Sequence, residues 1–179
     1  MKASLSSLSL DSQPPSRQAI RAELEAARIA FHDLLARMSS EDWRRQSSIL
    51  AWTNGHLSTH ILSYLTIVLP RGVRYAQKGR RTAGFPPLLV RLGIADRANK
   101  RAARWLARRH TPTTLRAAYD QAHADFLTLL DQVPEGDWEK STYVLGKSMT
   151  ILELFLVHAA HFDEHRPQVR HYPSDRVPA

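Results

Sequence analysis

Apolar residues recur every three or four positions in four stretches of this chain, with charged and polar residues between them. This spacing places the apolar side chains on one face of a helix, so it predicts four amphipathic helices. The predicted helices cover residues 16–38, 52–69, 111–133 and about 149–170. Thr53 or Asn54 is the expected N-cap of the second helix. Pro70 predicts a kink or an end near Leu69, because proline cannot donate a helix hydrogen bond.

These helices predict an all-α fold, a four-helix bundle in an up-down-down-up or similar arrangement. A faint repeat suggests pseudo-twofold symmetry, because the first and third helices both end in an acidic segment closed by a tryptophan, Trp43 or Trp138. Each of these segments leads through a short connection into a helix that carries histidines. Residues 16–171 are expected to form one domain, with a flexible N-terminal segment at 1–15 and a C-terminal tail at 172–179.

Residues 71–110, between the second and third predicted helices, form a basic insert with twelve Arg or Lys and one acidic residue, Asp96. The formal charge of the chain is +8, so the positive charge is concentrated in this insert. Residues 79–87 are expected to form a loop, and residues 96–109 a basic helix. Its apolar positions, Ala98, Ala102, Trp105 and Leu106, fall on one face. Such a run often forms a solvated helix face, but it also suits nucleic acid or an anionic membrane, and Trp105 and Leu106 suit a homodimer contact.

The chain of 179 residues contains no cysteine, which excludes disulfide bonds, thiolate metal ligands and a cysteine nucleophile. Any metal must therefore be bound by histidine or carboxylate, and thiol chemistry would need an external thiol. The longest apolar run, residues 61–69, is far shorter than the roughly 20 residues of a membrane span. The N-terminus has no continuous apolar core of the secretory type, so a soluble, cytoplasmic protein is expected.

The histidines indicate a specific kind of site. His158, His161 and His165 project from one side of the fourth predicted helix, among its apolar residues. Buried imidazoles need partners, and one metal ion can serve several of them at once. The pairs His56/His60 and His161/His165 have the i,i+4 spacing at which two imidazoles can reach one ion. The same spacing also fits core histidines that are satisfied by hydrogen bonds.

Trp52-x7-His60 in the second helix, together with His161-x3-His165 and Gln168 in the fourth, resembles the DinB/YfiT-like superfamily of four-helix bundles. The resemblance covers about residues 16–170. In that family one histidine of the second helix and a His-x3-His pair of the fourth bind a divalent ion, often zinc or nickel. The resemblance therefore implies His60, His161 and His165 as metal ligands. Members of the family include hydrolases, and transferases and isomerases that depend on mycothiol, bacillithiol or glutathione.

The function implied by this resemblance is a divalent-metal enzyme that activates an external low-molecular-weight thiol or water, for transfer or hydrolysis on a small electrophilic substrate. The alternative is a non-enzymatic module whose basic insert binds nucleic acid or an anionic membrane, with histidines that only stabilise the bundle. His158 is expected to support the ligands or to pack in the core, and Tyr64 to pack in the core or to present its hydroxyl to the site. His56 is expected to face solvent.

Overall fold

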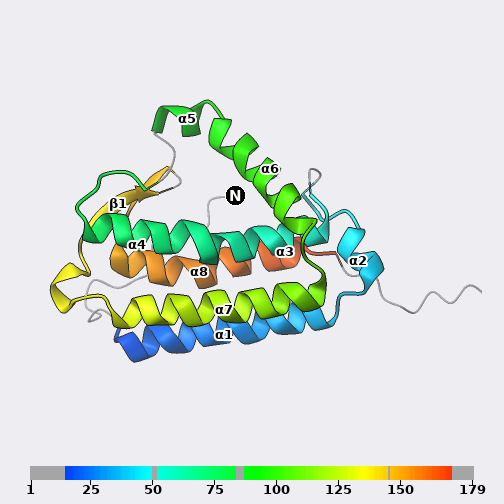
Figure 1. Ribbon diagram of the computed structural model, residues 1–179, viewed down its shortest axis with the longest axis horizontal. Helices are drawn as coiled ribbons and strands as arrows, with labels where there is room; N and C mark the ends of the chain where they lie inside the picture. The colour runs from blue at the N-terminus through cyan, green and yellow to red at the C-terminus, as the bar shows by residue number, and fades with distance from the viewer. Residues whose placement is uncertain (1–14, 50–51, 84–86, 145, 171–179) are drawn as a thin grey trace, which may run out of the picture.

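Four long helical segments lie alongside one another and form a bundle (Figure 1). The computed structural model describes residues 15–49, 52–83, 87–144 and 146–170. The bundle consists of α1 (Arg17–Ala36), the continuous run of α3 (Asn54–Ser63), η1 (Tyr64–Val68) and α4 (Leu69–Gln77), then α7 (Pro112–Asp131) and α8 (Ile151–His165). The colours of Figure 1 show that α1 and α8 run in one direction, and that α3–α4 and α7 run in the other. The predicted four-helix bundle is confirmed.

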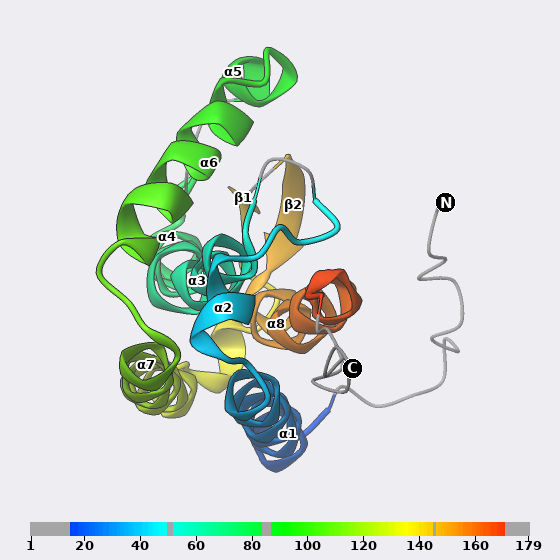
Figure 2. The ribbon, with the colours of Figure 1, turned by 90° about the vertical axis from the view of Figure 1, so that its right-hand side faces the viewer.

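The core lies between these segments, which occupy four corners when the bundle is viewed end-on (Figure 2). Aromatic rings connect the helices: Phe31 of α1 stacks on Tyr119 of α7 with ring centroids 4.3 Å apart, and Phe126 of α7 lies 4.6 Å from Phe155 of α8. All four rings are at most 1% exposed. Burial of such large apolar surfaces is the main term that favours the folded bundle.

The second helical segment passes Pro70 without ending. Of the kink or end predicted near Leu69, the structure shows no end: a π-helical turn separates α3 from α4, and the Leu69 N–H donates to the carbonyl of Tyr64, five residues earlier. Pro70 lies in the first turn of α4, immediately after this shift of the hydrogen-bond ladder, where a residue without an N–H is tolerated. The helix therefore continues to Gln77, and the first residues of the basic insert belong to the bundle.

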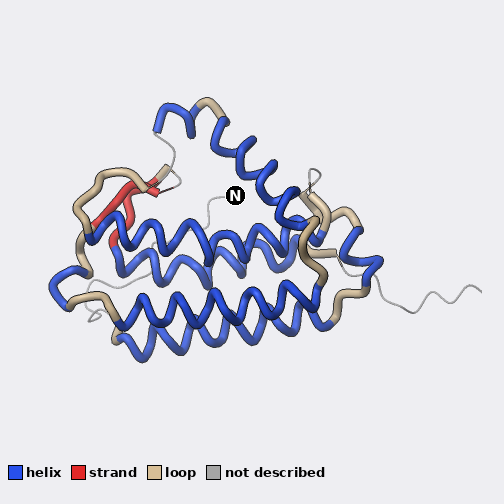
Figure 3. The backbone as a smooth tube through the Cα atoms, viewed as in Figure 1, coloured by secondary structure: helices blue, strands red, loops and turns tan. Residues whose placement is uncertain are grey.

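A β-hairpin precedes α8 and shortens it relative to the prediction (Figure 3). Strands β1 (Ser141–Val144) and β2 (Lys147–Thr150) pair antiparallel, and Gly146 adopts a left-handed φ of 91° in the connection. Thr150 is both the last residue of β2 and the N-cap of α8, where it forms a capping box with Glu153. The helix consequently begins at Ile151 rather than near Met149.

Between α4 and α7 the chain leaves the bundle, and α5 (Pro87–Arg91) and α6 (Ile94–Ala107) project from it (Figures 1 and 2). We call residues 87–109 the arm. The apolar face expected from Trp105 is not the face that packs: Ala103 and Ala107 are buried, whereas Trp105 is 50% exposed. No helix in the described residues is long and apolar enough to cross a membrane.

Candidate metal centre

Three histidines from two helices of the bundle converge on one point. His60 of α3 and His161 and His165 of α8 each offer a ring nitrogen, and these nitrogens all lie within 4.8 Å of one another. The ring centroid of His60 is 5.1 Å from that of His161 and also from that of His165. These are the residues that the family resemblance implied as ligands. Three imidazoles at this separation suit a divalent first-row metal ion and leave further coordination positions open.

His161 shows most directly that the residues fit a metal ion. Its Nε2 is buried and has no hydrogen-bond partner among the described residues. Burial lowers the pKa of His161 to about 2, with smaller contributions from the neighbouring imidazoles of His165 and His60. The ring is therefore neutral and can offer a lone pair. A buried nitrogen without a partner costs about 1–3 kcal/mol, and a bound cation would remove this cost.

Gln168 contacts His165 and fixes the position of its ring proton. Its Nδ1 lies 2.7 Å from the side-chain oxygen of Gln168. An amide oxygen only accepts, so the ring proton is on Nδ1 and the lone pair on Nε2. A metal-binding histidine commonly donates its second N–H to such a partner. Gln168 closes the short helix η3 (Arg166–Gln168), and its own carbonyl accepts from the N–H of Ser48 at 2.9 Å.

Asn54 connects the helix that carries His60 to the segment that follows the helix of His161 and His165. This fully buried residue opens α3, six residues before His60, and its side-chain NH2 donates to the carbonyls of Asp42 and Arg170, each at 2.9 Å. In return, the Arg170 N–H donates to its side-chain oxygen at 3.1 Å. The sequence pattern offered Asn54 only as an alternative N-cap. In the structure, Thr53 is the N-cap, and Asn54 holds the start of α3 against the chain that follows α8.

Aromatic rings form the walls of the centre. Tyr64 stacks on His161 with ring centroids 4.0 Å apart, and Trp52 lies 4.7 Å from His60. Burial raises the pKa of Tyr64 to about 12, so its hydroxyl stays protonated at neutral pH. Tyr64 thus contacts a candidate ligand through its ring. Both side chains are nearly buried and fix the orientation of the imidazoles that they touch.

The family of the chain follows from a comparison with family models. The model of the DinB superfamily matches residues 23–169, which include all three converging histidines. The chain is a member of the DinB superfamily. Among curated proteins, no match to this DinB protein is found.

The DinB protein also resembles two solved structures. Both are of a mycothiol-dependent maleylpyruvate isomerase, and one is a histidine-to-alanine mutant of it. Each superposes with a TM-score of 0.67, at 14% identity for the mutant and 15% for the other. The matches cover 88% and 87% of this chain but only 62% and 61% of the isomerase chains. The DinB protein thus shares their fold and spans about three fifths of their length.

Two further histidines that the sequence analysis considered lie outside the set of three. His158 is fully buried, and its Nε2 lies 2.6 Å from the hydroxyl of Tyr119, in the core of the bundle. His56 is half-buried rather than facing solvent, because its Nδ1 accepts from the Thr53 N–H at 3.1 Å and thereby completes the capping box of α3. Neither belongs to the group of potential ligands found among the described residues of the DinB protein.

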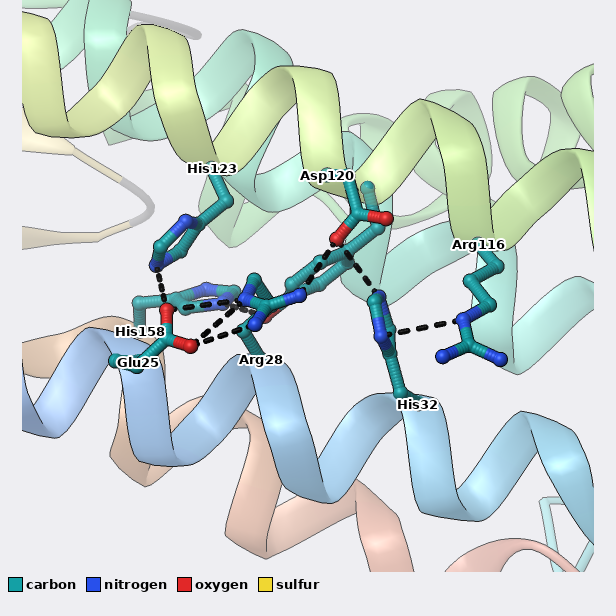
Figure 4. Close-up of polar contacts among 8 residues, drawn as sticks. Glu25, Arg28, His32, Arg116, Asp120, His123 and His158 are labelled. Atoms are coloured by element: carbon teal, nitrogen blue, oxygen red, sulfur yellow. Dashed lines mark hydrogen bonds and ion pairs between the residues drawn. The ribbon is translucent and has the colours of Figure 1, made fainter.

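A second set of charged and histidine side chains joins α1 to α7 (Figure 4). Arg28 contacts Glu25 at 2.6 Å and Asp120 at 3.0 Å, and Asp120 also lies 2.9 Å from Nε2 of His32. Arg116 donates to Nδ1 of His32 at 3.2 Å, which places the ring proton on Nε2, beside Asp120. Arg28 lies between the carboxylates of Glu25 and Asp120. We therefore interpret this set as an ion-pair network that holds the two helices together.

This network was not predicted from the sequence. Its residues lie at the edges of the apolar stripes, where charges normally face water. The signal that could have found it is the spacing of complementary charges on the two helices: Glu25, Arg28 and His32 on α1, and Arg116, Asp120 and His123 on α7.

Proposed function

We propose that this DinB protein is a divalent-metal enzyme that uses an external low-molecular-weight thiol to transform a small electrophilic substrate. The observation that carries the proposal is the convergence of His60, His161 and His165 in a chain that has no cysteine of its own. A bound zinc or nickel ion would supply a Lewis acid that lowers the pKa of a thiol or water toward neutrality.

The protein's own residues have separate roles in this proposal. The three histidines would hold the ion, and Gln168 keeps the ring proton of His165 on Nδ1, which leaves the lone pair of Nε2 for the ion. Tyr64 and Trp52 orient the imidazoles and exclude water from one side of the centre. The choice of a thiol rather than water is supported by the similar structures, which are described as those of a mycothiol-dependent isomerase. Hydrolysis by water is the competing outcome.

Metal content and thiol binding test the proposal together. Protein purified without an affinity tag is expected to contain, or to take up, zinc or nickel, measured by elemental analysis. Titration calorimetry with mycothiol, bacillithiol and glutathione is then expected to show that one of them binds the metal-loaded protein and not the chelator-treated protein. Absence of metal uptake contradicts the whole proposal. Metal uptake without thiol binding, accompanied by hydrolysis of ester or amide substrates, contradicts the use of a thiol and indicates that water is the nucleophile.

Gln168 provides a more specific prediction. Replacing Gln168 with alanine is expected to weaken zinc binding about 10–100-fold, because the Nδ1–H of His165 loses its acceptor and the ring can turn or change tautomer. Competition with a chromophoric chelator measures the change. Gln168→Glu keeps an accepting oxygen and is the matched control, with an expected affinity at or above that of the wild type. Equal affinity in Gln168→Ala and the wild type would show that the contact does not orient a ligand.

A further inference from the structure

Most of the large exposed apolar side chains of the described residues lie on the arm. Six such side chains are exposed, and four of them belong to residues 87–109. Leu88 is 63% exposed, Leu92 58%, Ile94 39% and Trp105 50%. Three of the four are clustered at the far end of the arm, where α5 meets α6 and the chain is farthest from the bundle (Figure 2). Clustered apolar surface on a projecting element indicates a contact with something outside the chain.

The outward face of α6 mixes apolar and positively charged residues. At 100° per residue, Ile94, Arg101 and Trp105 fall on the side of the helix opposite to the buried Ala103 and Ala107. The two buried residues of α6, Ala103 and Ala107, are small and allow a close approach to α3. Ile94 and Trp105, which are larger, are exposed.

Exposed arginines surround this apolar line. Arg97 and Arg108 flank one side of it, and on the other side Arg109 stacks its guanidinium over Trp105, 3.7 Å from the ring centroid. Arg91 is also exposed, near the far end of the arm. With a single acidic residue in 71–110, the arm has a strongly positive potential around its apolar side chains.

We propose that the arm docks on an anionic lipid membrane, with Leu88, Leu92, Ile94 and Trp105 at the boundary between headgroups and acyl chains, and the surrounding arginines on lipid phosphates. A helix that lies in the membrane interface combines these two features, apolar residues with tryptophan toward the lipid and arginine or lysine beside them. Tryptophan is favoured at the headgroup level because its ring is apolar and its N–H is polar.

Other occupants of the surface fit less well. Nucleic acid would use the arginines, but the exposed leucines and Ile94 have no role on a phosphate backbone. A second copy of the chain would bring two arms of the same strong positive charge together, which opposes association. A negatively charged bilayer satisfies both the charge and the apolar surface. The inference is independent of the proposed function, because the arm contains none of the three candidate metal ligands.

Vesicle binding by the full-length protein tests the proposal. We expect the protein to sediment with vesicles of phosphatidylcholine and phosphatidylglycerol at low salt, and not with vesicles of phosphatidylcholine alone. Binding should weaken as salt is raised, because surface electrostatics are screened. Lipids brominated on the upper acyl chain should quench the fluorescence of the wild type and not that of Trp105→Phe, since the other three tryptophans of the chain lie outside the arm.

Paired variants separate the two components of docking. Replacing Arg97, Arg101 and Arg108 with glutamine is expected to weaken binding to anionic vesicles about 100-fold, at about fivefold per arginine. The matched control replaces three exposed arginines outside the arm, Arg37, Arg44 and Arg74, so it has the same net charge. Its binding should stay within a few-fold of the wild type. Leu88→Ser with Leu92→Ser should weaken binding and abolish part of the quenching, while circular dichroism shows an intact helical fold.

Any of the following four results would contradict the proposal. Absence of binding to anionic vesicles at low salt does so directly. An equal loss in the arm variant and in its arginine control would show that only net charge matters. Tighter binding to duplex or single-stranded nucleic acid than to vesicles, unaffected by the serine substitutions, would assign the arm to nucleic acid. A concentration-dependent dimer that the serine substitutions dissociate would assign it to a second copy.

Discussion

Replacing His161 with leucine is expected to lower the affinity for zinc by more than about 100-fold, since loss of a partner outside the ligand set already costs about 10–100-fold. His161 is the candidate ligand whose Nε2 is buried without a hydrogen bond among the described residues, so its ring would gain most from an ion. Leucine keeps most of the volume against Tyr64 and removes the lone pair. The metal-free variant should therefore be about as stable as the metal-free wild type.

The measurement is the midpoint of thermal unfolding with and without zinc. A ligand that binds only the folded state raises the free energy of unfolding in proportion to the logarithm of its concentration over Kd. The wild type should be stabilised by zinc and His161→Leu should not. His56→Gln is the control, because it removes another histidine of α3 and keeps an acceptor for the Thr53 N–H. Zinc stabilisation of His161→Leu equal to that of the wild type would remove His161 from the ligand set.

The free energy of unfolding of the metal-free protein is expected to fall as the pH is lowered from about 6.5 to 4, and His158 is one of the buried histidines responsible. Burial lowers the pKa of His158 to about 4, whereas an unfolded histidine titrates near 6.5. In this window the unfolded chain binds a proton that the folded chain does not, so acid favours unfolding. The effect of this one group amounts to about 3 kcal/mol and is complete below the folded pKa.

Urea unfolding at several pH values, with chelator present, measures this dependence. His158→Gln can still form a hydrogen bond to Tyr119 but does not titrate, so its stability should change less with pH than that of the wild type. Burial also lowers the pKa of His32, His123 and His161, and these residues remain in both proteins, so the wild-type slope is reduced and not abolished in His158→Gln. Tyr119→Phe loses the same hydrogen bond while keeping the imidazole, and it should be less stable at every pH with an unchanged slope. Parallel curves for His158→Gln and the wild type would contradict the prediction.

The features of the fold that depend on local chemistry were predictable from the sequence. Helical spacing of apolar residues indicated the four helices of the bundle, and Thr53, one of the two residues expected as the N-cap of the second helix, is its N-cap. The hairpin before α8 was missed because strands of four residues carry too little alternation to distinguish them from a helix start. A kink or an end was predicted at Pro70, but the π-helical turn that precedes it was not, because such a turn has no sequence pattern of its own.

The candidate centre was predictable only in part. Spacing on α8 pointed to His161 and His165, and the family resemblance supplied His60. The contact between His165 and Gln168 could not be derived from spacing, because it requires the change from α8 to η3. The contacts of Asn54 join residues that are far apart in the chain, and only the packed structure shows them.

The contacts of Asn54 bear on which parts of the protein can change during evolution. They fasten the beginning of α3 to the segment after α8 at one end of the bundle, through hydrogen bonds that do not involve the connection between α4 and α7. That connection can therefore grow, shrink or change its charge while His60 and the α8 histidines keep their relative positions. A related chain with a different arm, or with none, should retain the same geometry of imidazoles as long as an asparagine opens this helix.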